Sequence, residues 1–297
     1  MNRKQLALVV ASAAVACALV AAALFTGGLT SSDGRLKVVA SFYPLAYFAE
    51  EIGGEKAKVD LLIPENAEPH AWEPGTSDIL KVDKADVFIY NGGGFEPWIG
   101  NFLDSAHNGA LTVVDTSAGI AISGDPHFWL DPLSAKLQVD NILAGFSSAD
   151  PGNAAYYEHN AQALKDRLDE LNQDFVDGLA GRLKNDIVTT HEGFDYMANR
   201  YGFNAHAAIG ISADEQPSVQ AIADLVDIVH GLGIHYVFVE PVYSDQYMET
   251  IAAETGAQTL VLDGIHGRTG VHSGMDYFEI MYANLEQLRI GLEAPGV

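Results

Sequence analysis

The segment "PGNAAYYEHNAQALKDRLDELNQDFVDGLAGRL", Pro151 to Leu183, has the pattern of one long amphipathic helix. Its large apolar residues recur at spacings of three and four, which places them on one side of a helix. They are Leu164, Leu168, Leu171, Phe175 and Leu179. A helix of roughly thirty residues spans about 45 Å, which is longer than one small domain needs. We therefore expect residues 149–184 to form a backbone helix that links two parts of the molecule.

Short apolar segments alternate with helical ones on both sides of this helix. The β-branched runs before it are "LKVVAS", "KVDLLIP", "DVFIYNG" and "LTVVDTS", and those after it are "NDIVTT", "FNAHAAIGI", "HYVFVEP" and "QTLVLDG". The helix-like segment "PLAYFAEEIGG" separates the first two runs. Such alternation is typical of βαβ units with a parallel sheet. The predicted fold class is α/β, with two parallel-sheet lobes at residues 36–148 and 185–297 and a binding cleft between them.

Composition limits the classes of ligand. The chain has 297 residues and a formal net charge of −24, which argues against a nucleic-acid partner because phosphates would be repelled. The same field favours cations near the surface, although an acidic surface also simply keeps a protein soluble. Cys17 is the only cysteine, so the chain forms no intramolecular disulfide. Any metal in the lobes must be held by nitrogen and oxygen.

The N-terminus predicts export. Basic residues precede an uncharged apolar run from Leu6 to Phe25, which is roughly the length that spans a bilayer. We interpret residues 1–26 as an uncleaved membrane anchor, with a cleaved signal segment and lipidation at Cys17 as the alternatives. Residues 27–35 are rich in glycine and serine and predict a flexible tether. The lobes are therefore expected outside the cytoplasmic membrane, tethered to its outer face, or periplasmic if the segment is removed.

Four possible metal ligands follow predicted strands. His70 lies in the proline-rich loop "NAEPHAWEPGTSDI", His127 lies in "GDPHFWLDP", and His191 and Asp263 each end a strand. Open α/β sheets bind their ligands beyond the carboxyl ends of parallel strands. Three imidazoles and one carboxylate suit Zn²⁺, whereas manganese prefers more oxygen donors. Copper and nickel are not excluded by ligand type alone.

Other polar residues near these positions are candidates for auxiliary roles. We expect exposed loop positions for His266 and His272 in "DGIHGRTGVHSG", with capture of an entering metal as the alternative. Glu240, at a strand end, is a candidate to support a ligand from behind. Asp131 is expected to cap the helix that follows it, and Asp125 either to cap or to orient His127.

Several longer motifs resemble the zinc/manganese-type solute-binding proteins of metal ABC transporters. They are "EPHAWEPGTSDI", "DPHFWLDP", "THEGFDYMANRYG", "ISADEQPSVQAIADLV" and "VFVEPVYSDQYMETIAAETGAQTLVLD". The resemblance runs from about Lys37 to the C-terminus. It implies two α/β lobes, a backbone helix and a metal in the interlobe cleft. By motif matching, the family's ligands fall on His70, His127, His191 and Asp263.

The resemblance also bears on the metal. Manganese-type members tend to place glutamate at the third ligand position, whereas zinc-type members place histidine, as this chain does with His191. Many zinc-type members carry a loop rich in histidine and acidic residues before the second histidine. Here the segment Ser117–Gly124 is "SAGIAISG", which lacks such residues. Mn²⁺ or Fe²⁺ therefore stays open as an alternative to Zn²⁺.

The predicted function is capture of Zn²⁺ and its delivery to an ABC permease, by a monomer that is not an enzyme. A metal-binding surface adhesin is an alternative. A zinc hydrolase is disfavoured because the metalloprotease motif needs a second histidine where "HEGFD" has Asp195, and because four protein ligands leave no position for a catalytic water.

Overall fold

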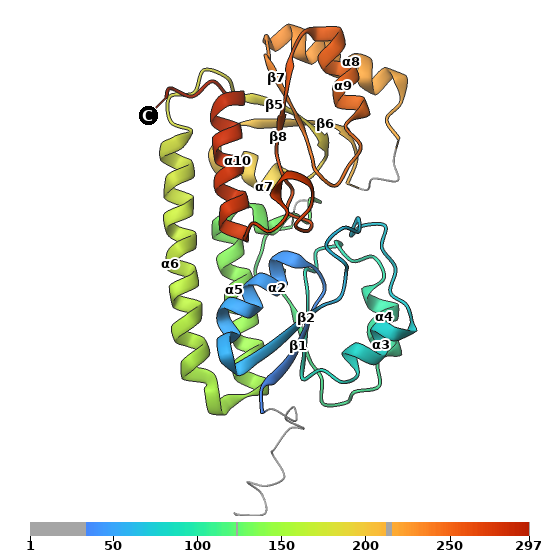
Figure 1. Ribbon diagram of the computed structural model, residues 1–297, viewed down its shortest axis with the longest axis vertical. Helices are drawn as coiled ribbons and strands as arrows, with labels where there is room; N and C mark the ends of the chain where they lie inside the picture. The colour runs from blue at the N-terminus through green and yellow to red at the C-terminus, as the bar shows by residue number, and fades with distance from the viewer. Residues whose placement is uncertain (1–33, 123, 212–215, 297) are drawn as a thin grey trace, which may run out of the picture.

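The computed structural model describes residues 34–122, 124–211 and 216–296 (Figure 1). The predicted anchor at residues 1–26, Cys17 and the tether up to residue 33 lie outside the described residues. Across the described ranges, no helix is both long enough and apolar enough to cross a bilayer.

The N-terminal lobe is built on one parallel sheet. Its strands are β1 (Leu36–Ala40), β2 (Ala57–Leu61), β3 (Val87–Tyr90) and β4 (Thr112–Asp115), in the order β2-β1-β3-β4. All neighbouring strands pair in parallel, so their carboxyl ends lie at one edge. The intervening helices are α2 (Tyr43–Gly53), α3 (Thr76–Val82) and α4 (Ile99–Ser105). All four strands coincide with predicted segments.

The C-terminal lobe contains two parallel strand pairs. β5 (Asp186–His191) pairs with β6 (Asn204–Ile209), and β7 (Tyr236–Val239) pairs with β8 (Gln258–Val261). The two pairs adjoin at β5 and β7, where the Thr190 hydroxyl donates to the Phe238 carbonyl at 3.4 Å. The helices of this lobe are α7 (Asp195–Tyr201), α8 (Val219–Leu232), α9 (Gln246–Thr255) and α10 (Tyr277–Gly291).

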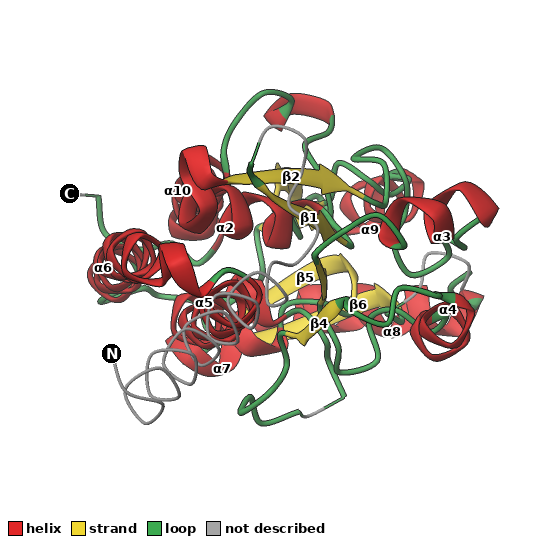
Figure 2. Cartoon of the chain, turned by 90° about the horizontal axis from the view of Figure 1, so that it is seen from below, coloured by secondary structure: helices red, strands yellow, loops and turns green. Residues whose placement is uncertain are grey.

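Two helices connect the lobes. α5 (Pro132–Ala149) begins at an N-cap, where the Asp131 carboxylate accepts from the Leu133 N–H, as predicted. α6 (Ala154–Gly178) follows a short 3₁₀ turn and runs beside both lobes (Figure 1). The predicted apolar stripe is buried along its whole length. Seen from below, α6 and α10 lie at one side of the molecule and α3 and α4 at the other (Figure 2).

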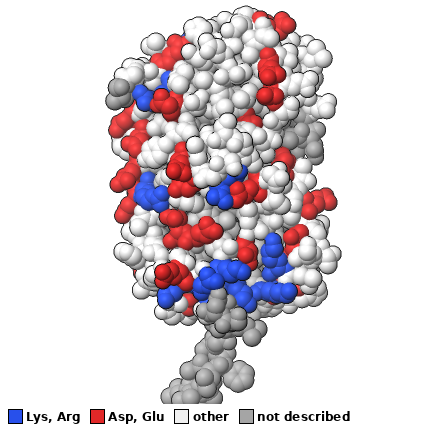
Figure 3. Space-filling model, in the orientation of Figure 1, with Lys and Arg blue, Asp and Glu red and all other residues white. Residues whose placement is uncertain are grey.

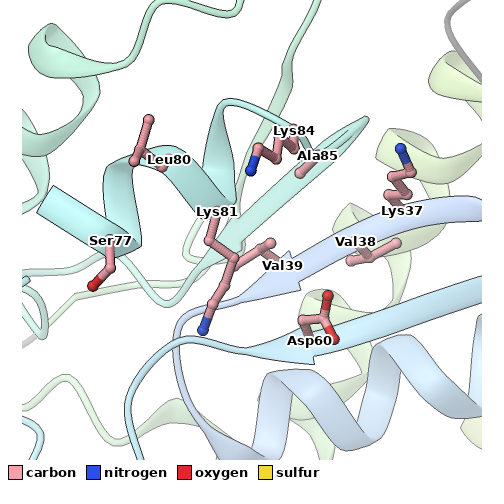
Figure 4. A pocket seen from close by; sticks show the side chains of 9 residues that line it. All are labelled: Lys37, Val38, Val39, Asp60, Ser77, Leu80, Lys81, Lys84 and Ala85. Carbon is pink, nitrogen blue, oxygen red and sulfur yellow. The ribbon is translucent and has the colours of Figure 1, made fainter. Parts of the chain in front are cut away.

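Charge is unevenly distributed over the surface. Acidic side chains are spread over the face shown in Figure 3, whereas lysine and arginine gather at the lower end of the N-terminal lobe. Lys37, Lys81 and Lys84 line a cavity of about 490 Å³ beside β1 and α3 (Figure 4). This cavity contains none of the predicted metal ligands, which lie at or beyond strand ends elsewhere in the molecule.

Candidate metal centre

His70 is held in its loop by a nearby carboxylate. Glu68 accepts hydrogen bonds from the backbone N–H groups of His70 (3.0 Å) and Ala71 (2.7 Å). The imidazole is half-buried and packs edge-on against the ring of Phe95, with centroids 4.7 Å apart. The backbone of His70 is thus fixed within its own loop, and its ring is placed by Phe95 from the segment after β3.

His127 is fully buried, and its ring is oriented by Asp125. One Asp125 oxygen lies 2.8 Å from the His127 backbone nitrogen and 2.5 Å from its Nδ1. The other accepts from the backbone N–H of Asp195, in the C-terminal lobe, at 3.0 Å. Asp125 was predicted either to cap a helix or to orient His127, and the structure shows that it orients His127. Nε2 of His127 is thereby turned away from Asp125.

His191 ends β5 and is also fully buried. Its Nδ1 lies 2.7 Å from the Glu240 carboxylate, and its backbone N–H donates to the same carboxylate at 3.0 Å. Glu240 follows β7 directly and is 3% exposed. Glu240 therefore supports His191 from behind, as predicted from its place at a strand end.

The fourth position differs from the prediction, because the structure brings His266 rather than Asp263 to the other three histidines. His266 is 3% exposed, in contrast to the exposed position predicted for it. Beyond β8 the chain stays buried through Ile265, whose backbone φ of 53° helps turn the loop back toward the centre. His266, which lies further beyond the end of β8, therefore faces the site in place of Asp263.

Asp263 has a different set of partners. Its carboxylate lies 2.7 Å from Nδ1 of His272 and accepts from the backbone N–H of Ile265 at 2.8 Å. Asn284 of α10 binds both backbone groups of Asp263. His272 is also buried, so the predicted exposed position for it is wrong. Asp263 and His272 thus brace the loop that carries His266.

The four imidazoles His70, His127, His191 and His266 converge through their Nε2 atoms. Nε2 of His127 lies 3.2 Å from that of His70, 3.1 Å from that of His191 and 3.1 Å from that of His266. The four candidate ligand atoms all lie within 4.8 Å of one another. Nitrogens that surround a tetrahedral Zn²⁺ at about 2.0–2.1 Å are about 3.3 Å apart. The three separations from His127 are close to that spacing.

Burial keeps three of these rings in the form that binds metal. Burial, together with the neighbouring His127 and His191, lowers the pKa of His70 to about 2. Burial also lowers the pKa of His127, against the opposing hydrogen bond to Asp125. The pKa of His266 falls well below its ordinary value for the same reason. These three imidazoles are therefore neutral at pH 7, as metal ligation requires.

Residues 38–291 match the model of a family described as "Zinc-uptake complex component A periplasmic". The chain belongs to this family. Its members are solute-binding components of zinc uptake systems, so the chain is a binding protein and not an enzyme. The resemblance stated from the sequence motifs is confirmed.

Named relatives agree in sequence. The chain is 33% identical over 288 residues to the "High-affinity zinc uptake system protein ZnuA" of Bacillus subtilis, and the match covers 90% of both. It is 31% identical to the "Zinc-binding protein AdcA" of Streptococcus pyogenes over 89% of this chain. The match spans only 58% of the length of that AdcA protein, which is therefore longer than the shared part.

Solved structures of relatives agree in fold. The zinc-bound ZnuA-like domain of Streptococcus pneumoniae AdcA superposes with a TM-score of 0.78 at 30% identity, covering 88% of this chain and 100% of that one. The laminin-binding protein Lmb of Streptococcus agalactiae, described as having adhesin and metal-transporting activity, gives a TM-score of 0.81 at 27% identity. That match covers 86% of this chain and 99% of the other. The predicted fold of two α/β lobes joined by a long helix is confirmed.

Proposed function

We propose that this zinc-uptake family member captures Zn²⁺ outside the cytoplasm and delivers it to an ABC permease. The observation that carries the proposal is the convergence of four Nε2 atoms between the lobes. His70 and His127 come from the N-terminal lobe, and His191 and His266 come from the C-terminal lobe. The ligand set that we propose replaces Asp263 with His266.

The donor set supports zinc over the harder cations. Four imidazole nitrogens face the centre, while the carboxylates of Asp125 and Glu240 are occupied with the far nitrogens of His127 and His191. Imidazole suits zinc, whereas Mn²⁺ prefers carboxylate, carbonyl and water oxygen. The family description and the zinc-bound neighbour support the same choice of cargo.

A four-nitrogen shell also supports transport over catalysis. Catalytic zinc sites use three protein ligands and leave one position for water or substrate. Four protein ligands fill a tetrahedron, so the bound ion has no position at which to activate water. Release then requires that ligands from one lobe move away from those of the other, and a contact with the permease would supply that movement.

A substitution series tests the ligand set. Zinc is titrated into metal-stripped protein in competition with a chelator. His266→Ala is expected to weaken binding by more than the roughly 10–100-fold loss typical of second-shell groups. Asp263→Asn should have a smaller effect because Asp263 acts through the loop. His107→Ala, at an exposed histidine, serves as the control. Normal binding by His266→Ala together with a large loss in Asp263→Asn would restore Asp263 as the fourth ligand.

Adhesion is the second candidate function. It is favoured by one observation, the structural similarity to Lmb at a TM-score of 0.81. Adhesion by itself does not require four convergent imidazoles. A solid-phase assay with immobilised laminin, in the presence and absence of zinc, tests this candidate separately from metal capture.

A further inference from the structure

The loops that carry His70 and His266 are joined by a bidentate ion pair between the lobes. Nε of Arg268 lies 2.9 Å from one oxygen of Glu65, and a terminal nitrogen lies 2.6 Å from the other. Glu65 precedes His70 in the loop after β2, and Arg268 follows His266 in the loop after β8. The pair therefore links the ligand-bearing loops of opposite lobes.

The same two loops meet through their backbones. A Cβ at Gly267 would lie 2.0 Å from the carbonyl oxygen of Glu65, so only glycine fits there without a shift. On its other side the Arg268 guanidinium lies over the ring of Tyr43, 4.9 Å from the centroid. Arg268 is thus held between a carboxylate and an aromatic face of the N-terminal lobe, although it belongs to the C-terminal lobe.

We infer that Glu65 and Arg268 form a latch that keeps the His70 and His266 loops together and so slows the escape of bound zinc. They are positioning residues, because they act through the two histidines and are not among the candidate ligands. The inference rests on the function proposed above. Separating the lobes requires this ion pair to break at the same time as the ligands part.

A second bidentate pair also joins the lobes, but it is less suited to a test. Arg200 of α7 binds both oxygens of Asp131 at 2.8 Å. Asp131 also caps α5, so removing it would disturb that helix as well as the contact between lobes. Glu65 and Arg268 lie outside helices and strands, which allows the ion pair to be removed alone.

Dissolved salt should weaken the latch, because the ion pair is partly exposed to solvent. The side chains of Arg268 and Glu65 are 37% and 31% exposed, so dissolved ions screen their attraction. Its contribution to holding zinc should therefore be largest at low ionic strength. Imidazoles bind a metal in their neutral form, so the contribution of the four histidines should change little with salt.

A double-mutant cycle on the dissociation rate tests the latch. Zinc-loaded full-length protein is mixed with excess chelator, and release is followed for the unsubstituted chain, Glu65→Gln, Arg268→Gln and the double variant. Each single change is expected to speed release by about 3–10-fold, and the double by no more than Arg268→Gln alone, because that change already removes both the ion pair and the contact with Tyr43. The differences should shrink at 1 M salt. Arg289→Gln, which breaks the Glu286 pair on α10, should release zinc at the unsubstituted rate.

The outcomes separate the two levels of the proposal. Unchanged release rates in both single variants, or single effects that simply multiply in the double variant, would overturn the latch and leave zinc capture intact. Failure of the unsubstituted protein to bind zinc would overturn the proposed function and the latch with it. If both single variants melt at an equally lowered temperature without metal but release zinc at the unsubstituted rate, the ion pair is only structural.

Discussion

Glu240 holds His191 at two points, its backbone N–H at 3.0 Å and its ring Nδ1 at 2.7 Å. The carboxylate comes from the end of β7 and the histidine from the end of β5, so a contact between neighbouring strands sets the direction of the ring. Because Nδ1 is engaged, Nε2 is the nitrogen left to face the centre.

Removing this support should weaken zinc binding without removing a ligand. Glu240→Ala is expected to cost about 10–100-fold in zinc affinity, since the ring loses the partner that fixes its tautomer and orientation. Glu192→Ala, at the exposed neighbour of His191, is the matched control and should bind normally. Competitive titration measures both. A larger loss at Glu192 than at Glu240 would show that the register of this ligand is different.

Gly193 leaves room for two of the imidazoles. A Cβ there would lie 2.3 Å from Nε2 of His191 and 3.1 Å from Cε1 of His127. Gly193→Ala should therefore displace His191 and reduce zinc affinity at least tenfold, a loss of about 1.4 kcal/mol or more. Gly231 in α8 has open space around it, so Gly231→Ala should bind zinc normally and gain about 0.5–1 kcal/mol of stability. Equal zinc affinity in both variants would contradict this placement of Gly193.

The lowered pKa values predict little proton release when zinc binds near neutral pH. Three ordinary imidazoles with a pKa near 6.5 would together release about 1.5 protons at pH 6.5. Here burial lowers the pKa of His70 to about 2 and also lowers those of His127 and His266, so the folded protein is already deprotonated at these positions. Protons begin to compete only as the pH falls toward the lowered values.

Calorimetry in buffers of different ionisation enthalpy counts the released protons. We expect these three rings to contribute close to none at pH 6.5, so their protonation should not weaken zinc binding between pH 8 and pH 6.5. Release of about one proton or more from them would mean that the metal-free protein opens and exposes its imidazoles to water.

Zinc should stabilise the folded chain, because the four proposed ligands come together only when both lobes are folded. At a free zinc concentration of 100 times the dissociation constant, binding adds about 2.7 kcal/mol to the free energy of unfolding. Thermal melting with and without zinc measures this, and a chelator should reverse the shift. Mn²⁺ at the same concentration is expected to give a smaller shift. A larger shift with Mn²⁺ would favour the manganese alternative.

Much of the fold could be predicted from the sequence because its signals are local. The β-branched runs became β1 to β8, and the stripe on α6, including Leu168 and Phe175, is buried as its spacing indicates. The division of the second lobe into the pairs β5-β6 and β7-β8 could not be predicted in this way. Strand pairing depends on packing between distant segments, which periodicity does not report.

The site was predictable where a strand end sets the position. His191 ends β5 and faces the centre, as a strand-end residue should. The same rule selected Asp263, but the loop beyond β8 bends at Ile265 and brings His266 inward instead. No sequence pattern indicates a positive φ at an isoleucine, so this turn could not be predicted. The pair formed by Glu65 and Arg268 is likewise hidden, because 203 residues separate its members.

The long helix α6 limits how far the two lobes can move relative to each other. Its buried face packs on α2 and α5 of one half, while Gly178 near its end approaches Leu285 of α10, where an added Cβ would lie 3.1 Å away. A continuous helix that packs against both lobes resists wide hinge bending. Zinc binding and release must therefore proceed by small displacements of loops. Solution X-ray scattering should accordingly give nearly the same radius of gyration with and without cargo, and a permease would have to recognise loading from those loops rather than from a change of overall shape.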